Sequence, residues 1–185
     1  MFKSVDSNIN LPKLENEVSE YWDSISAFKT SLDNRKDEKV FRFYDGPPFP
    51  TGSPHYGNLL AGVIKDIVPR YWTMRGYYVE RRFGWDVHGL PIEMEVQKNL
   101  NLEDPQQIDE FGIDKFNEAC RSQVQTNTEN WEKITRKIGR WVDFENDYKT
   151  MDIDFMESVW WVFKELWSKG LIYQDYKVLP YSWAA

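Results

Sequence analysis

The sequence predicts an α/β fold in which a strand–helix–strand unit carries a ligand site. Strand-like residues at 40–44 precede a helical pattern at 58–75, and a second strand-like run follows at 77–83. Such a unit usually has parallel strands and a right-handed crossover. A polar segment rich in glycine and proline follows each strand-like run, at 45–58 and at 84–93. Because ligands of α/β folds bind at the carboxyl ends of the strands, the two segments predict one shared site.

The composition is that of a globular protein, with 41% hydrophobic and 16% aromatic residues in a chain of 185. The single cysteine, Cys120, excludes an internal disulfide framework, and the two histidines disfavour a protein-built transition-metal site. No apolar run is long enough to span a bilayer, and the first residues lack the apolar core of a signal peptide. We therefore expect a cytoplasmic protein with no membrane partner, and we expect it to be a monomer.

The net charge of −7 argues against the broad basic surface that nucleic-acid-binding proteins usually carry. Two local basic clusters interrupt the acidic balance. We interpret both as solvated helix faces that pair with nearby carboxylates. The clusters comprise Arg70, Arg75, Arg81 and Arg82, and Lys133, Arg136, Lys137 and Arg140.

The first predicted element is an amphipathic helix over 14–32. Its apolar residues recur at helical spacing: Leu14, Val18, Tyr21, Trp22, Ile25 and Phe28. The polar run 33–39 is a linker. The sequence VFRFY at 40–44 is short, aromatic and β-branched, so it predicts the first strand.

The second predicted helix spans 58–75. Its apolar residues form one face: Leu60, Ile64, Ile67, Val68 and Tyr71. Pro69 lies inside the helix and should kink it, because the proline ring removes a backbone donor. Gly76 is a natural end to the helix, and the sequence YYVERRF at 77–83 predicts the second strand.

The rest of the chain is mainly helical in pattern. Helices are predicted at 92–100 and 114–139, with a turn at Asp104 and Pro105 between them. Asp154 and Glu157 resemble a capping box that opens a further helix ending at Gly170. The sequence LIYQDYKV at 171–178 then predicts a strand. Because the chain stops just beyond aromatic residues without a polar tail, we expect it to be cut from a longer protein.

The segment 45–58 has the features of a phosphate-binding turn. A helix that starts directly after a strand presents unpaired N–H groups and a positive dipole to an anion. Gly52 and Gly57 let the backbone approach a ligand closely. His55 and Asn58 lie three positions apart at the helix start, so both can face one side and donate to the same phosphate. The alternative is a Gly/Pro-rich turn in which His55 is a surface or helix-capping residue. The pattern is neither a Walker loop nor GxGxxG.

The segment 84–93 adds a carboxylate to this picture. Asp86 follows a strand and precedes a helix, where it can hold an ammonium group or a ribose hydroxyl. His88 is either a donor that faces the ligand or a residue that orients other groups.

Together, GPPFPTGSPHYGN and GWDVHGLPIE resemble the N-terminal part of isoleucyl-tRNA synthetases, a family of class I aminoacyl-tRNA synthetases. The first stretch is similar to the signature usually written HIGH, and the second to the amino-acid-binding turn. The valyl enzymes have a GTDHAG-like turn there, and the leucyl enzymes a GWDAFGLP-like turn. The likeness covers essentially the whole chain.

The resemblance implies the first half of a Rossmann-like catalytic domain, preceded by a helical extension and followed by a helical connective segment. Residues 1–39 would be the extension and linker, and residues 40–185 the catalytic half with the start of the connective insertion. The implied cofactors are ATP and Mg²⁺, and the implied partners are isoleucine and tRNA(Ile). Isoleucine would be activated to isoleucyl-adenylate and then transferred to tRNA. The editing, KMSKS-loop and anticodon-binding parts are absent from the sequence.

The resemblance also implies roles for individual residues. His55 and Asn58 would be catalytic; Thr51, Gly52, His55, Gly57 and Asn58 would bind ATP; Gly46, Pro47, Asp86 and His88 would bind the amino acid; no residue would bind a metal. Asn58 stands where the signature usually has its second histidine, so it can donate a hydrogen bond but cannot carry charge. Two alternatives stay open, a catalytically inert folding or nucleotide-binding module and a valyl-type enzyme.

Overall fold

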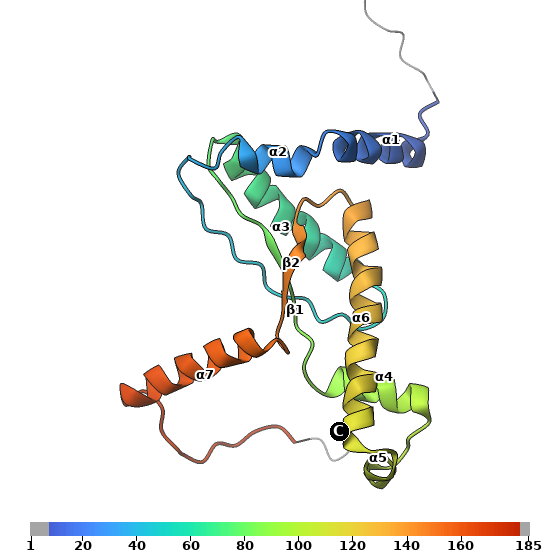
Figure 1. The fold of residues 1–185 in the computed structure, drawn as a ribbon, viewed down its shortest axis with the longest axis vertical. Coiled ribbons are helices and arrows are strands. Elements are labelled where there is room, and N and C mark those ends of the chain that lie inside the picture. Colours follow the sequence, from blue (N-terminus) through green and yellow to red (C-terminus); the bar gives the residue numbers. More distant parts are fainter. Residues whose placement is uncertain (1–7, 182–185) are drawn as a thin grey trace, which may run out of the picture. The chain divides into compact units, whose positions relative to one another are not determined.

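The computed structural model describes residues 8–181, which separate into two compact units, 8–150 and 151–181. The first unit contains (Figure 1) α1 Leu11–Ser24, α2 Ala27–Asp33, α3 Tyr56–Met74, β1 Arg82–Trp85, α4 Leu90–Leu100, α5 Pro105–Phe111, α6 Ile113–Lys137 and β2 Asp143–Lys149. The second unit contains α7 Ile153–Ser168. No helix in the described part of the chain has the length and apolar character needed to cross a membrane.

The single helix predicted over 14–32 is wrong, because the structure has two helices there. Asn10 caps α1 by accepting a hydrogen bond from the backbone N–H of Lys13 at 3.1 Å. The helix then breaks at Ser26, which takes a left-handed conformation with φ 46°. The apolar spacing continues across this break, so periodicity alone gave no sign of it. Trp22 of α1 packs edge-on against Trp141, with 5.3 Å between the ring centroids.

Helix α3 confirms the second predicted helix and its end. It begins at Tyr56 and ends at Met74, and Gly76 follows with φ 89°. The N–H of Gly76 donates to the carbonyl of Thr73 at 3.1 Å, which closes the last turn. Pro69 lies inside the helix and is buried, and a kink there stays a prediction.

The sheet differs from the predicted pair of strands. Its two strands, β1 and β2, are parallel, and Gly84 pairs with Tyr148. The predicted strand at 40–44 is reduced to one parallel bridge, Val40 with Tyr78, so its direction is confirmed but not its extent. Sequence reasoning missed β2 because its residues, DFENDYK, are too polar to show a strand pattern.

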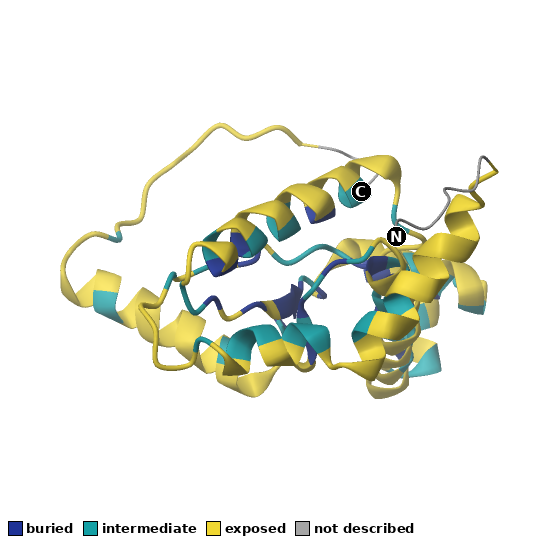
Figure 2. Cartoon of the chain, turned by 90° about the horizontal axis from the view of Figure 1, so that it is seen from above, coloured by how far each residue is buried: buried dark blue, intermediate teal, exposed yellow. Residues whose placement is uncertain are grey.

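The hydrophobic core lies around β1 and the inner face of α6, and Figure 2 shows buried segments both in the sheet and on the helices around it. Phe83 and Trp85 of β1 are only 1% exposed, and Phe83 stacks on Phe144 with ring centroids 4.6 Å apart. Arg81 is also buried, which corrects its interpretation as part of a solvated face. Its Nη2 donates to Thr73 Oγ1 at 2.5 Å, and burial lowers the pKa of Arg81 to about 10.

Helices α4, α5 and α6 form the helical segment that follows β1, and α6 packs against both α4 and α5. The helices α4 and α6 confirm the predictions at 92–100 and 114–139, with ends shifted by one or two residues. The predicted turn at Asp104 and Pro105 is instead the start of α5. Asp104 accepts a hydrogen bond from the N–H of Gln106 at 2.8 Å and forms a capping box with Gln107.

The second unit confirms the predicted helix but neither its capping box nor the strand after it. Helix α7 begins at Ile153, so Asp154 lies inside its first turn, and the preceding Asp152 makes no side-chain capping bond. Gly170 ends the helix with φ 67°, as predicted. Residues 171–178 form no strand. Their apolar pattern favours extended backbone, but a strand also needs a neighbour to complete its ladder of hydrogen bonds.

Candidate functional site

The two Gly/Pro-rich segments meet in the structure. The backbone N–H of Asp86 donates to the carbonyl of Pro48 at 2.9 Å. On the other side of the same turn, the N–H of Val87 donates to Thr150 Oγ1 at 3.0 Å. The turn that carries Asp86 is therefore held between the first segment and the end of β2. This agrees with the expectation that both segments contribute to one site.

His55 and Asn58 cap the start of α3 reciprocally. The N–H of Asn58 donates to His55 Nδ1 at 3.3 Å, and the N–H of His55 donates to Asn58 Oδ1 at 3.0 Å. A neutral imidazole that accepts at Nδ1 carries its proton on Nε2. The cap thus leaves His55 Nε2 and the amide nitrogen of Asn58 as donors. The capping reading of His55 is confirmed, and it is compatible with a ligand contact through Nε2.

Gly57 makes room for this arrangement. A Cβ atom at residue 57 would lie 2.9 Å from Cε1 and 3.1 Å from Nδ1 of His55, so any larger residue would push the imidazole away. The amides of Tyr56 and Gly57 belong to the first turn of α3, where helix geometry gives them no intrahelical acceptor. They add two N–H groups and the positive end of the helix dipole to the donors of His55 and Asn58.

The remaining predicted residues lie along the same two segments. Thr51, Gly52 and Gly46 are exposed on the first segment, and Pro47 is half-buried. Asp86 is half-buried on the second segment, while His88 is exposed just before Gly89, the residue that precedes α4. The structure therefore places the turn that carries the half-buried Asp86 next to a partly exposed loop and a helix start.

Sequence reasoning missed a buried ion cluster beneath this loop. The side chain of Asp45 is 1% exposed, and its Oδ1 lies 2.8 Å from Lys65 Nζ. The Asp45 Oδ2 atom accepts from Arg140, whose side chain is 6% exposed. The sequence suggested that Arg140 belongs to a solvated helix face. This interpretation is wrong, because its side chain is buried. The sequence held one sign of the buried ion cluster: Asp45 is a carboxylate that directly follows an apolar run and precedes Gly46.

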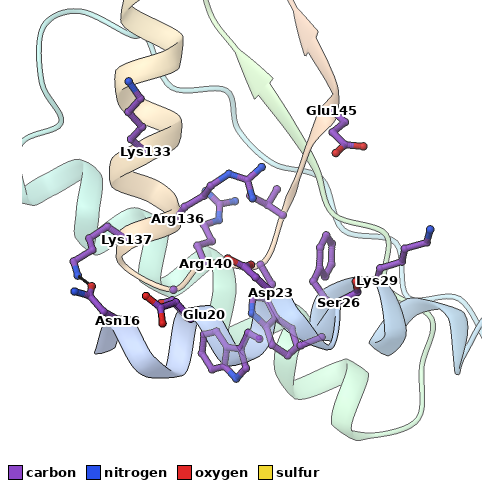
Figure 3. A pocket seen from close by; sticks show the side chains of 17 residues that line it. Asn16, Glu20, Asp23, Ser26, Lys29, Lys133, Arg136, Lys137, Arg140 and Glu145 are labelled. Atoms are coloured by element: carbon purple, nitrogen blue, oxygen red, sulfur yellow. Dashed lines mark hydrogen bonds between the residues drawn. The ribbon is translucent and has the colours of Figure 1, made fainter. Parts of the chain in front are cut away.

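Two cavities lie near α6, and neither encloses the predicted residues as a group. The larger, about 580 Å³, lies between the α1–α2 helices and the end of α6 (Figure 3), and its lining contains none of the predicted site residues. The smaller, about 60 Å³, lies under the loop and is lined by Pro48, Asn58, Lys65 and Arg140 among others. We place the candidate site at the exposed start of α3 because the free donors lie there. Among the described residues, no group of three or more His, Cys, Asp or Glu side chains is placed to hold a metal ion.

Replacing Gly84 by alanine should destabilise this region. A Cβ at residue 84 would lie 2.2 Å from Cζ of Tyr148, whose hydroxyl donates to the carbonyl of Asp45 at 3.2 Å. Burial raises the pKa of Tyr148 above its ordinary value. We expect G84A to lower the free energy of unfolding by about 1–3 kcal/mol, as overpacking usually does. Urea denaturation measures the change. The variant Gly46→Ala is the control, since residue 46 does not have a positive φ and its Cβ would meet only Lys65 Nζ, at an ordinary contact distance of 3.8 Å, and equal losses in both variants would contradict the steric explanation.

Comparisons with known proteins bear on this site. A family model described as tRNA synthetases class I (I, L, M and V) matches residues 17–185. An isoleucine--tRNA ligase of Bdellovibrio bacteriovorus is 53% identical over 181 residues, which cover 98% of this chain and 17% of that protein. The cytoplasmic isoleucine--tRNA ligase of Arabidopsis thaliana is 55% identical over 173 residues, or 94% of this chain and 14% of that protein. The corresponding enzyme of Mycobacterium leprae is 56% identical over 174 residues, or 94% of this chain and 16% of that protein.

The structure is also similar to a solved one. The crystal structure of the ternary complex of Agrobacterium radiobacter K84 agnB2 LeuRS, tRNA and LeuAMS matches 87% of this chain and 18% of that chain. The TM-score is 0.61 at 21% sequence identity, so the likeness concerns the fold. The chain spans between 14% and 17% of the length of the curated relatives named above.

Proposed function

Because this chain belongs to the class I tRNA synthetase family and has its Rossmann-like catalytic fold, we propose that it supplies the signature half of the active site of an isoleucine--tRNA ligase. The observation that carries this proposal is the identity of 53–56% over nearly the whole chain to isoleucine--tRNA ligases. The contact between Pro48 and the Asp86 turn supports it, because it joins the phosphate-binding and amino-acid-binding segments. We assign residues 1–39 to a helical extension and residues 40–185 to the catalytic half with the start of the connective insertion.

The proposed reaction has two steps. The carboxylate of isoleucine attacks the α-phosphate of ATP, and pyrophosphate leaves. A ribose hydroxyl at the 3′ end of tRNA(Ile) then takes the isoleucyl group from the adenylate. No residue acts as a covalent nucleophile, so positioning and electrostatic stabilisation provide the acceleration.

The start of α3 suits the charge that develops on the phosphates. His55 Nε2, the amide nitrogen of Asn58 and the amides of the first turn of α3 would donate to phosphate oxygens. Thr51 and Gly52 lie on the adjoining loop and would contact ATP. Mg²⁺ would be held mainly by the ATP phosphates.

The amino acid would bind at the neighbouring turn. Asp86 would accept a charge-assisted hydrogen bond from the ammonium group of isoleucine. Gly46 and Pro47 would lie against the substrate, with His88 at the edge of the turn. The tRNA would be bound largely outside these 185 residues. A cytoplasmic monomer remains our expectation, and one relative carries the word cytoplasmic in its name.

Asp86→Asn should selectively weaken the binding of isoleucine. The amide keeps the shape of the carboxylate but loses the charge, and a hydrogen bond to a charged group contributes about 1.5–3 kcal/mol. We expect the KM for isoleucine to rise about 10–100-fold with the KM for ATP little changed. Steady-state pyrophosphate exchange measures both constants. Equal increases in the two KM values would contradict an ammonium contact.

The function itself is tested by ATP–pyrophosphate exchange with isoleucine and valine side by side, in a protein of the relatives' length. Isoleucine-dependent exchange is the expected result, and exchange that favours valine would point to a valyl-type enzyme. The same assay on the 185-residue chain addresses the alternative of an inert module, which the 14–17% coverage of the relatives favours for the isolated chain. Adenylate formation by this chain alone would refute that alternative.

A further inference from the structure

The loop at 45–52 is held by its carbonyl groups. Lys65 Nζ donates to the carbonyl of Gly46 at 2.6 Å, and the N–H of Asp86 donates to that of Pro48 at 2.9 Å. Further along, Asn127 Nδ2 donates to the carbonyl of Pro50 at 2.8 Å, and Trp131 Nε1 to that of Gly52 at 2.8 Å. Groups outside the loop therefore bind the carbonyls of residues 46, 48, 50 and 52, and the carbonyl of Phe49 is bonded within the loop by the N–H of Thr51.

Prolines explain why carbonyl groups are the points of attachment. Residues 47, 48 and 50 are prolines, which have no N–H to donate to a neighbouring strand. The donors that hold the loop therefore come from outside it and bind its carbonyl groups.

The first end of the loop is held by charge. Lys65 bridges the carbonyl of Gly46 and the carboxylate of Asp45, and Arg140 binds the other carboxylate oxygen. Tyr148 donates to the carbonyl of Asp45 at 3.2 Å. Asp45 is almost fully buried. A buried carboxylate with two cations and a fixed carbonyl has little freedom to move, so Gly46 and Pro47 have little freedom either.

The second end is held by α6. Asn127 and Trp131 are four residues apart on this helix and are 7% and 4% exposed. The Asn127 amide also donates to Glu95 of α4 at 3.1 Å, which fixes its orientation toward Pro50. Neither residue carries a role in the reaction proposed above, and both lie in the helical connective segment.

We propose that these groups form a two-ended clamp in which Lys65, through Gly46 and Asp45, positions the amino-acid subsite and Trp131, through Gly52, positions the ATP subsite. The inference rests on the proposed function for the identity of the two substrates. Lys65 and Trp131 are positioning residues, because they act on the substrates through the loop backbone. In this clamp, α6 is part of the site at which the amino acid is activated. Each end of the clamp affects the binding of a different substrate.

Substitutions at the two ends test the clamp in the full-length enzyme. Lys65→Met removes a charged donor and should raise the KM for isoleucine about tenfold, with the KM for ATP within about twofold of wild type. Trp131→Phe removes the indole N–H together with part of the buried ring, and should raise the KM for ATP at least about threefold, with isoleucine little affected. Lys65→Arg keeps the charge and donors and should restore most of the loss. Thr128→Val is the control on α6, because its buried hydroxyl bonds only within the helix, to the carbonyl of Gln125.

Hydrogen exchange provides a readout that needs no substrate. The N–H of Asp86 bonds to Pro48, and that of Thr51 bonds to Phe49 at 3.0 Å. Exchange should accelerate at Asp86 in Lys65→Met and at Thr51 in Trp131→Phe, but at neither in Thr128→Val. Unchanged hydrogen exchange at these amides would overturn the clamp. Faster hydrogen exchange with unchanged KM values would overturn the role of the clamp in substrate binding. A wild-type enzyme without isoleucine-dependent exchange of pyrophosphate would overturn the proposed function instead, while the amide measurements would still decide whether the loop is clamped.

Discussion

His55→Ala should lower the rate of isoleucine-dependent pyrophosphate exchange by about 10²–10³, because loss of one preorganised donor to developing charge costs about 3–4 kcal/mol. The structure makes the donor explicit. His55 accepts the N–H of Asn58 at Nδ1, which places the imidazole proton on Nε2. Gly57 provides the space in which the ring lies. The measurement is kcat and KM for exchange at saturating isoleucine, and a rate within about twofold of wild type would refute the assigned role.

The same substitution also removes a helix cap, so a control must separate the two effects. Loss of an N-cap typically lowers stability by about 0.5–2 kcal/mol. His55→Asn is the matched variant, because asparagine is a favourable N-cap and can accept from the N–H of Asn58, but it lacks the imidazole Nε2. We expect His55→Asn to unfold near the wild-type urea concentration and still to lose about 10²-fold or more in rate. If His55→Asn retained the wild-type rate, the cap and not the phosphate contact would explain the effect of alanine.

Sequence periodicity predicted the long helices better than the sheet. The helices α3 and α6 each have an uninterrupted helical pattern, with glycine following soon after their ends, and both were found within two residues of the predicted limits. The break at Ser26 was missed because apolar spacing persists on both sides of it. Strand β2 was missed because pairing with β1, and not its own polar residues, holds it extended. Residues 171–178 show the converse, a strand-like sequence without a paired strand.

The candidate site was predictable where chemistry resides in a local pattern. The residues of 45–58 and 84–93 are contiguous in sequence, and the prediction that they share one site agrees with the bond from Asp86 to Pro48. The supporting groups come from distant positions. Arg140 lies 95 residues from Asp45, and Trp131 lies 79 residues from Gly52. No local spacing relates such pairs, and both arginines that proved to be buried, Arg81 and Arg140, resembled ordinary surface charges in the sequence.

Asp45→Asn should reduce the free energy of unfolding by about 3 kcal/mol, the lower part of the range for breaking a buried ion pair. The amide would leave Lys65 and Arg140 without a counter-charge. Lys65 is 30% exposed, so water can compensate it in part, whereas Arg140 is 6% exposed and would remain a buried, unpaired cation. Urea denaturation gives the change through the midpoint and slope. The exposed pair Glu132–Arg136 supplies the control, because Glu132→Gln should cost less than about 1 kcal/mol.

A double variant tests whether the unpaired charge is the cause. Asp45→Asn combined with Arg140→Met removes the buried cation together with its partner; methionine retains much of the arginine stem but not the guanidinium group, whose carbon lies 5.2 Å from the centroid of the Phe83 ring. We expect the double variant to be more stable than Asp45→Asn alone, because neutral groups of similar volume can replace a buried pair at little cost. If the losses were simply additive, the two residues would not be coupled. In that case the carboxylate would stabilise the loop through Lys65 alone, and the rigidity of Gly46 and Pro47 would depend on one partly exposed lysine.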